Sequence, residues 1–569
     1  MLPIGIEPFY SNKYLNMNKF ITAVISAVTL TSIPGFAQQN SINNPMTQAM
    51  FEVYTSEIAA NPNDPDLYYR RANEYYKFNQ YLRALSDVDK ALQLTTENDR
   101  DLRFLSYMLR AEIYQMTDKH REALSDFSSA LALDPTSFMA LYQKANEEYE
   151  LGDYSAAKAD YTRMRAINPR SPEALTGLAR VAVKENNLGL ASEFMDDAVE
   201  LMPSDSDVYI RRASVRRMLN NNTGAVQDLL MAISIDNNTR AFQELIDIAN
   251  EDYPAVISGL STSITYAPRQ GMLYYIRGFI AQAHDHFLSA LADYQKLIDD
   301  GMYEYAGLYN SIAQCQLALC TYPDAMNSVD NAISMDGGKN PEFYVTKARI
   351  YYAQNRMEFA EDALKEATSK GQLSARDTDW RGIIDFGAGE YDAANELFGG
   401  LIIDQPDVMR NYIYRAWVLN DGMKQTDAAR NLYNRVVGMT EPAEADPSNP
   451  VAAGEKTAKP LTAISTYRGF ALLYSGDKDA AVKWGDDLLR DYRDTDGYLS
   501  YMVACLYANC GDNDRAFSTL EKALQLGYGN LYELTAADYG RVSIAPLRSD
   551  SRFNVLLARY SHLFEKTDK

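Results

Sequence analysis

Small apolar residues recur along this chain with a fixed spacing. A small residue is followed twelve positions later by Ala and, seven positions after that, by Ala or another apolar residue. The instances are Ala72/Ala84/Ala91, Ala111/Ala123/Ala130, Ala145/Ala157/Met164, Ala179/Ala191/Ala198, Ala213/Ala225/Ala232, Gly278/Ala290/Leu297, Ala313/Ala325/Ala332, Ala348/Ala360/Ala367, Gly382/Ala394/Leu401, Ala416/Ala429/Val436 (with one inserted residue), Gly469/Ala481/Leu488 and Ala504/Ala516/Ala523. Neighbouring triplets usually start 34 or 35 positions apart, which predicts a repeated unit of two short helices.

The spacing also predicts how the units pack. Each helix pair is expected to have a tight polar turn, such as Gly152-Asp153 or Gly511-Asp512. Small residues let the paired helices approach closely, and a larger side chain four positions after the middle Ala fills the space between units. Examples of that larger side chain are Phe127, Tyr161, Tyr294, Phe398 and Tyr433. One unit cannot bury its own apolar face, so the units are expected to stack into a solenoid.

This pattern resembles the tetratricopeptide repeat (TPR), and the resemblance covers roughly residues 65–526. It implies an all-α fold, a right-handed α-solenoid of about 12–13 helix pairs with one degenerate unit and one Pro-rich inserted loop. The predicted segments are 1–37 (upstream residues and a signal peptide), 38–64 (N-terminal capping helix), 65–237 (first part of the array), 238–270 (degenerate repeat, with a bend or shortened helix), 271–439 (second part), 440–464 (Pro-rich loop), 465–526 (third part) and 527–569 (C-terminal cap).

The beginning of the chain predicts export. A short positive region starts at Met17, an apolar stretch follows over residues 20–33, and small residues precede Gln38. This is typical of a secretory signal peptide cleaved near Ala37, with Met17 as the start of translation, and it predicts a periplasmic or secreted protein. The alternative is a membrane anchor, for which the apolar stretch is too short. No other apolar stretch reaches 18 residues, so no transmembrane helix is expected in the mature chain.

Composition excludes some functions and yields no catalytic motif. With 55 Lys and Arg against 77 Asp and Glu, the net charge of −22 argues against nucleic-acid binding. Phosphate-loop, dinucleotide-binding, nucleophile-elbow and HExxH motifs are absent from the sequence, so no enzyme activity, cofactor or metal is predicted. His284-Asp285-His286 is interpreted as a solvated turn rather than a metal site. Two cysteine pairs, Cys315/Cys320 and Cys505/Cys510, are interpreted as small core residues, because residues five apart on a helix are too distant to bridge. A disulfide is the alternative if the helix ends between the two cysteines.

The resemblance implies a binding groove lined by the first helix of each unit. Residues three before, one after and four after the first small residue share one face of that helix. With nearby arginines, they give the candidate groove residues Tyr69, Asn73, Tyr76, Tyr142, Asn146, Tyr149, Arg180, Arg211, Arg217, Arg349, Tyr352 and Trp417. An Asn side chain can bind a peptide backbone because its amide both donates and accepts hydrogen bonds. Arg pairs with carboxylates, which favours an acidic segment as the partner, unless these arginines pair with nearby Asp and Glu on their own helices.

These observations predict a non-catalytic scaffold of the cell envelope that holds a protein or peptide segment in its concave groove. The alternative is a glycan-binding protein of a nutrient-uptake system, because aromatic rings stack on sugars. Such lipoproteins carry a lipidated Cys and large insertions between repeats, and this chain has neither feature. Self-association through the concave face is a further hypothesis.

Overall fold

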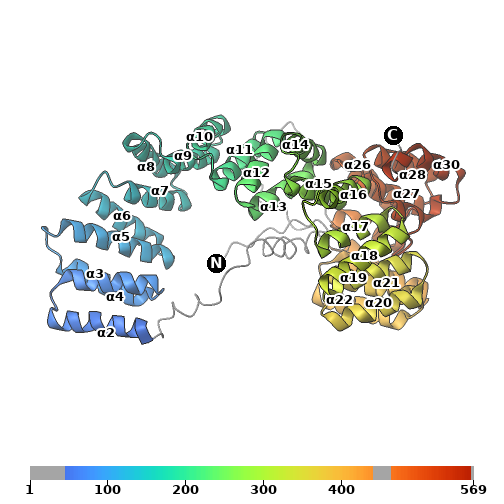
Figure 1. The fold of residues 1–569 in the computed structure, drawn as a ribbon, viewed down its shortest axis with the longest axis horizontal. Coiled ribbons are helices and arrows are strands. Elements are labelled where there is room, and N and C mark those ends of the chain that lie inside the picture. The colour runs from blue at the N-terminus through green and yellow to red at the C-terminus, as the bar shows by residue number, and fades with distance from the viewer. Residues whose placement is uncertain (1–44, 440–462, 566–569) are drawn as a thin grey trace. The chain divides into compact units, whose positions relative to one another are not determined.

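The computed structural model describes residues 45–439 and 463–565, and throughout these ranges it is helical without a β-strand (Figure 1). The predicted all-α class is therefore confirmed. The described chain divides into an N-terminal unit that ends at Phe242 and a C-terminal unit that starts at Gln243. In the two described ranges, no helix is both long and apolar enough to cross a membrane. The predicted leader 1–37 and nearly all of the predicted loop 440–464 lie outside the described residues.

The N-terminal unit consists of a leading helix followed by helix pairs, each pair having an odd-numbered first helix. Its helices are α2 (Pro45–Ala60), α3 (Pro65–Lys77), α4 (Tyr81–Leu94), α5 (Arg100–Met116), α6 (His120–Leu133), α7 (Phe138–Glu150), α8 (Tyr154–Ile167), α9 (Pro172–Lys184), α10 (Leu188–Leu201), α11 (Ser206–Met218) and α12 (Asn222–Asp236). The leading helix packs on α3 through Phe51, whose ring stacks on Tyr75 with centroids 4.4 Å apart.

The C-terminal unit continues the same alternation, so α3 to α28 form thirteen consecutive pairs within the described ranges, in line with the predicted number. Its helices are α13 (Thr239–Glu251), α14 (Tyr253–Tyr266), α15 (Gly271–Ala283), α16 (Phe287–Asp299), α17 (Ala306–Ala318), α18 (Tyr322–Asp336), α19 (Pro341–Ala353), α20 (Met357–Lys370), α21 (Ala375–Ala388), α22 (Tyr391–Asp404), α23 (Met409–Trp417) with its π-helical continuation η1 (Val418–Gly422), α24 (Thr426–Val437), α25 (Ala463–Ser475), α26 (Lys478–Asp491), α27 (Tyr498–Asn509), α28 (Asn513–Gln525), α29 (Leu531–Thr535), η2 (Ala545–Leu547), α30 (Ser551–Arg559) and η3 (Ser561–Leu563).

The small residues of the repeat lie at the helix–helix contacts, as predicted. Ala72, Ala84 and Ala91 are completely buried, and the larger residue Tyr161 is completely buried as well. Gly382 shows why a small residue is required, because a Cβ at this position would lie 2.5 Å from the ring of Phe398.

The turns inside the pairs follow one rule with one exception. In most pairs a residue with a left-handed backbone joins the two helices; these residues are Asn79, Asp118, Gly152, Asn186, Asn220, Asp285, Cys320, Asn355, Gly389, Lys424, Gly476 and Gly511. Asn, Asp and Gly predominate because they tolerate this conformation best. In the predicted degenerate unit, Asp252 alone joins α13 to α14, with φ of −149°. That unit keeps helices of 13 and 14 residues, so the expected shortened helix is not observed.

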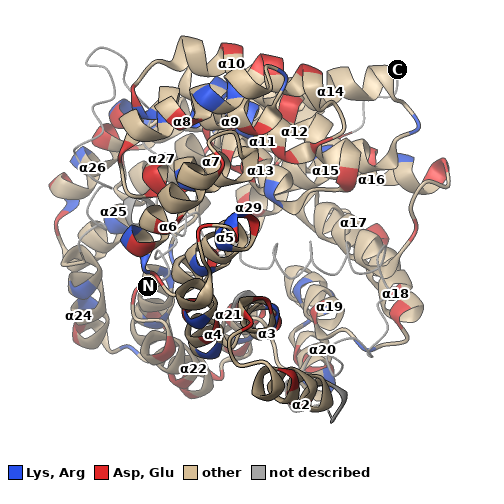
Figure 2. Cartoon of the chain, turned by 90° about the vertical axis from the view of Figure 1, so that its left-hand side faces the viewer, with Lys and Arg blue, Asp and Glu red and all other residues tan. Residues whose placement is uncertain are grey.

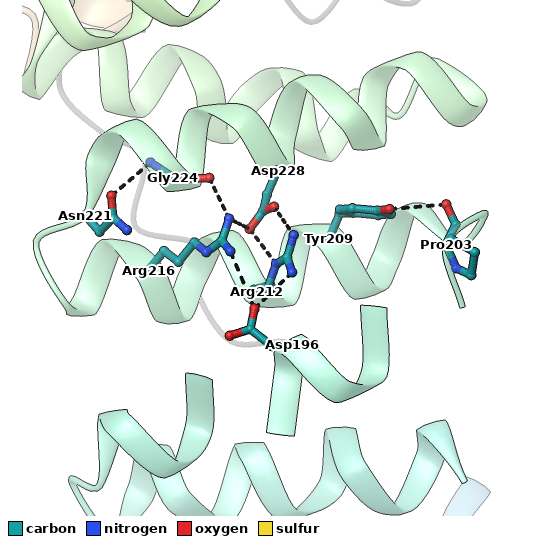
Figure 3. A network of polar contacts seen from close by, with 8 residues as sticks. All are labelled: Asp196, Pro203, Tyr209, Arg212, Arg216, Asn221, Gly224 and Asp228. Atoms are coloured by element: carbon teal, nitrogen blue, oxygen red, sulfur yellow. Dashed lines mark hydrogen bonds and ion pairs between the residues drawn. The ribbon is translucent and has the colours of Figure 1, made fainter. Parts of the chain in front are cut away.

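Ion pairs across the helices of one pair recur in five repeats, and we call them basic–Asp clasps. The residue before the first small residue is basic and contacts an Asp sixteen positions later on the second helix. The pairs are Arg71–Asp87 (2.6 Å), Arg110–Asp126 (2.7 Å), Lys144–Asp160 (2.6 Å), Arg212–Asp228 (2.7 Å) and Arg277–Asp293 (2.6 Å). Each arginine also reaches the second helix of the preceding pair or α2. Arg212, for example, contacts Asp196 at 2.9 Å (Figure 3), so the clasps join neighbouring repeats.

The segment after the last pair runs along the C-terminal unit from its early repeats toward its late ones. The backbone N–H of Gly529 donates to the carbonyl oxygen of Asp285 at 2.9 Å. Further along, the ring of Tyr539 lies edge-on to Trp380 with centroids 5.4 Å apart. We call residues 527–548 the return segment. Helix α30 then contacts the last pair, where Arg552 pairs with Asp514 at 2.8 Å.

Candidate functional site

The first three predicted groove residues lie on α3, and we call the side of the N-terminal unit that carries its predicted groove residues the inner face. Tyr69, Asn73 and Tyr76 are all partly buried. Burial raises the pKa of both tyrosines, Tyr69 and Tyr76, and the nearby carboxylate of Glu112 is the second cause. The side chain of Asn73 makes no hydrogen bond to any residue in the described ranges, so its amide can still donate and accept.

Glu112 on α5 lies next to these tyrosines, and sequence reasoning missed it. It occupies the position that Asn73 has on α3 and Asn146 has on α7, one residue after the first small residue. The side chain is partly buried, and within the described ranges it has no hydrogen bond or ion pair. Burial raises the pKa of the Glu112 carboxyl. The signal was present in the repeat register, because the same position had singled out Asn73 and Asn146.

The second predicted group, on α7, is already engaged by the protein. The side-chain oxygen of Asn146 accepts hydrogen bonds from Tyr161 Oη at 2.7 Å and Arg180 Nη1 at 3.2 Å. Arg180 also pairs with Glu150 at 2.7 Å and covers the ring of Tyr149 at 3.9 Å. Two donors occupy the oxygen of Asn146, so this amide can only donate to a ligand. The remaining member of the group, Tyr142, is partly buried.

The arginines of α11 separate into two classes. Arg212 and Arg216 both hold Asp228, at 2.7 and 2.9 Å, and both contact Asp196 (Figure 3). The alternative that arginines of these helices pair with acids on their own helix does not hold for Arg212 and Arg216, because their acidic partners lie on α10 and α12. Arg211 is exposed and contacts no described residue through an ion pair or hydrogen bond. Arg217 is partly buried and has a partner within the protein.

In the C-terminal unit, the protein itself covers the predicted groove residues. Arg349 lies over the ring of Trp380 at 4.6 Å, and Tyr352 is edge-on to the same ring at 6.1 Å. Burial, with the carboxylate of Asp538 in the return segment, raises the pKa of Tyr352 to about 12. Trp417 is 4% exposed and packs against Phe386 with ring centroids 3.8 Å apart. Trp417 therefore belongs to the core of this unit, and its part in a peptide-binding groove stays a prediction.

The return segment brings an arginine to the first helices of this unit. Arg541 forms two hydrogen bonds with the carboxylate of Asp421 on η1, one of them from Nε to Oδ2 at 2.7 Å. Its guanidinium lies 5.6 Å from the centre of the Tyr474 ring. The hydroxyl of Tyr474 donates to the carbonyl oxygen of Arg541 at 2.6 Å. A carboxylate and a tyrosine on first helices thus hold a basic side chain and its backbone.

The His284-Asp285-His286 turn is not solvated, which corrects the sequence interpretation. His284 and Asp285 are 5% and 3% exposed. The ring of His284 hydrogen-bonds through Nδ1 to Asp496 at 2.6 Å, and His286 stacks on Tyr253 with centroids 4.4 Å apart. Residues more than two hundred positions away cover this turn. In the described ranges, no group of three His, Cys, Asp or Glu side chains is placed to hold a metal ion.

The cysteine interpretation is confirmed for three of the four residues. Cys315, Cys505 and Cys510 are buried, Cys320 is partly exposed, and all four thiols are free of disulfide bonds.

Acidic and basic residues are interspersed along the helices of the N-terminal unit (Figure 2).

Comparison with protein-family models matches two stretches of the chain, residues 148–213 and 498–526, both to models described as tetratricopeptide repeat. The chain contains tetratricopeptide repeats. The chain is also similar to parts of several longer proteins. The chain is 28% identical over 118 residues to protein unc-45 homolog B of Xenopus tropicalis, which is 21% of this chain and 12% of that protein. It is 28% identical over 175 residues to cellulose synthase operon protein C of Pseudomonas fluorescens, 30% of this chain and 13% of that protein.

Human tetratricopeptide repeat protein 16 is 25% identical over 197 residues, 32% of this chain and 22% of that protein. The chain thus spans less than a quarter of the length of these relatives. Among solved structures, YrrB, described as a TPR protein with an unusual peptide-binding site, covers 34% of this chain and 96% of its own at 22% identity and a TM-score of 0.29. A TPR protein from Parabacteroides merdae covers 53% of this chain and 98% of its own at 18% identity and a TM-score of 0.28.

Proposed function

We propose that this protein is a non-catalytic scaffold that binds a segment of another protein along the inner face of its N-terminal unit. The observation that carries the proposal is the unequal state of the two units. On α3 to α11, the amide of Asn73, the carboxylate of Glu112 and the guanidinium of Arg211 have no partner among the described residues. In the C-terminal unit, the corresponding first helices hold the return segment. Polar groups left without partners beside aromatic rings are suited to binding a ligand.

The solenoid would supply a surface that is ordered before the partner binds. Repeat stacking fixes the first helices, so the scaffold loses little conformational entropy on association. Asn73 would bind the main chain of the segment, and the tyrosines of α3 and α7 would contact its side chains. Arg211 would bind a carboxylate, so we propose that the segment carries an acidic residue at this end of the face. The proposed location is the periplasm or the cell exterior, on the strength of the predicted signal peptide.

Affinity capture from the native cell envelope, after brief cross-linking, tests this function. The baits are the chain 38–569 and its Asn73→Ala/Arg211→Ala variant, in which neither changed side chain supports the described fold. Asn98→Ala/Arg121→Ala is the matched control, because these residues are exposed, on a loop and on α6. We expect a partner that is lost with the first variant and kept with the control.

A partner retained by both variants would contradict binding at this face. Recovery of no protein would contradict the scaffold and would direct attention to the glycan-binding alternative, which a glycan array tests. Sedimentation velocity of the same baits would show self-association as a second boundary.

A further inference from the structure

Glu112 stands out on the inner face of the N-terminal unit as a carboxylate without a compensating cation. It is partly buried, and burial is the cause of its raised pKa, with no contribution from a basic group. The basic side chain at the end of α3, Lys77, is engaged by Glu74 at 2.7 Å. The nearby acid on α7, Glu147, is instead partnered by Gln115 at 2.6 Å and by His120.

Leaving a partly buried carboxylate unpaired is unfavourable in the ligand-free protein. The basic–Asp clasps of the same unit show that acids elsewhere in these repeats receive a partner; the side chain of Asp87, in the adjacent repeat, is 10% exposed and held by Arg71 at 2.6 Å. The exception at Glu112 therefore indicates that its partner comes from outside the described residues.

Aromatic rings beside Glu112 narrow the chemistry of that partner. Tyr69 and Tyr76 on α3 pack against the apolar cluster that includes Leu109 and Ile113 of α5, the latter next to Glu112 in the sequence. After burial, the Glu112 carboxylate makes the largest contribution to the raised pKa of both tyrosines. A carboxylate combined with tyrosine rings favours a cation, because the carboxylate supplies charge and the ring faces attract a positive group.

The C-terminal unit contains this same combination with its ligand bound. Asp421 on η1 holds Arg541 of the return segment through two hydrogen bonds, and the ring of Tyr474 lies 5.6 Å from the guanidinium. Here an acid and a tyrosine from first helices receive a basic side chain from a non-helical part of the return segment. Glu112 with Tyr69 and Tyr76 presents the same groups on α5 and α3, without the arginine.

We infer that Glu112, flanked by Tyr69 and Tyr76, is a binding site for a Lys or Arg side chain of the bound protein segment. The inference rests on the proposed function and adds to it the chemistry of one ligand position. With a carboxylate of the segment at Arg211, the ligand would carry a basic residue toward α5 and an acidic residue toward α11. Such a pattern would fix the direction in which the segment lies along the repeats.

A peptide library tests the site while the natural partner is still unidentified. The probe is a random dodecapeptide library displayed on phage, selected on the full-length chain. The selected peptides are then labelled with fluorescein and titrated by fluorescence anisotropy. The variants are Glu112→Gln and, as a matched control, Glu193→Gln, which removes an exposed carboxylate on the second helix α10.

We expect the selected peptides to share one Lys or Arg, and Glu112→Gln to weaken their binding roughly ten- to hundredfold while the control leaves it unchanged. Glu112→Lys should then bind the peptide in which that basic residue is replaced by Glu to within about threefold of the original pair. Circular dichroism of each variant verifies folding.

Two results would overturn the inference, and they are distinguishable. If peptides bind with equal affinity to the wild type and to Glu112→Gln, the cation site is wrong, and the scaffold proposal stands. If no peptide binds the wild type more tightly than it binds Asn73→Ala/Arg211→Ala, the proposed function fails, and the cation site fails with it.

Discussion

The clasp around Asp228 offers the most direct test of what holds the repeats together. The side chain of Asp228 is 3% exposed and receives Arg212 Nη2 at 2.7 Å, Arg212 Nε at 3.0 Å and Arg216 Nη1 at 2.9 Å (Figure 3). The substitution Asp228→Asn keeps the shape and removes the charge. It leaves two partly buried guanidinium groups whose remaining contacts include the carboxylate of Asp196 and, for Arg216, the carbonyl oxygen of Gly224 at 3.2 Å.

The magnitude follows from burial. Removing one partner of a buried ion pair destabilises a protein by about 3–5 kcal/mol. The arginines are 15% and 21% exposed and keep Asp196, so water and that carboxylate recover part of the loss. We expect Asp228→Asn to lower the free energy of unfolding of α11 and α12 by about 2–3 kcal/mol. Arg212→Met should have a smaller effect, because Arg216 still holds Asp228.

Native-state hydrogen exchange with mass spectrometry is the suitable assay, because stability in a repeat array is distributed over neighbouring units. The matched control is Glu185→Gln, which breaks the pair Lys158–Glu185, 45% and 35% exposed, and should cost about 0.5 kcal/mol. Added salt should reduce the control effect and leave the Asp228 effect nearly unchanged. If Asp228→Asn destabilises α11 and α12 no more than the control does, the clasps do not hold the repeats together.

Three further predictions concern the two units. Asn146→Ala should lower the free energy of unfolding of the N-terminal unit by about 1–2 kcal/mol, because Tyr161 and Arg180 lose their hydrogen-bond acceptor. The control Asn73→Ala should leave urea unfolding unchanged. Equal effects of the two substitutions would contradict the assigned contacts. Burial lowers the pKa of His286 to about 4, so between about pH 6.5 and 4 the unfolded chain binds more protons than the folded chain. The free energy of unfolding of the C-terminal unit should therefore fall by up to about 3 kcal/mol as pH decreases through that window. His286→Gln should flatten this dependence, and an unchanged profile would refute it. Ellman's reagent should label Cys320 first in the native protein, because the other three thiols are buried; simultaneous labelling of all four would contradict the structure.

The solenoid was predictable from sequence because its determinants are local and repeated. Each triplet places small residues at the same contacts, so an error at one unit is corrected by its neighbours. The candidate site was less predictable because its partners are not local. Arg180 binds Glu150 across two helix pairs, and the acid that holds Arg212 is sixteen positions away on another helix. Helix periodicity indicates which face a side chain occupies and does not indicate whether another helix has already engaged it.

The return segment could not be predicted because its contact partners are even farther away in the sequence. Arg541 and Asp421 are 120 positions apart, and Thr535 and Cys320 are 215 positions apart. Nothing in the repeat register indicates that residues 527–548 run along the first helices of the C-terminal unit. The interpretation of the histidine turn as solvated was wrong because Asp496 and the return segment, both distant in the sequence, cover it. Glu112 differs, since its register position was visible and only its lack of a partner required the structure.

The comparison between Asp421 and Glu112 also bears on where a ligand for Glu112 comes from. Arg541 is supplied by the same chain, so its effective concentration at Asp421 is on the order of millimolar, and it competes well against an arginine from another molecule. The return segment of a second copy would have to leave its own Asp421, Tyr474 and Trp380 before it could bind elsewhere. Its release would lose those contacts and expose the apolar groups that it covers. Exchange of return segments between copies is therefore unfavourable, and a basic segment of a different protein is the better ligand for Glu112.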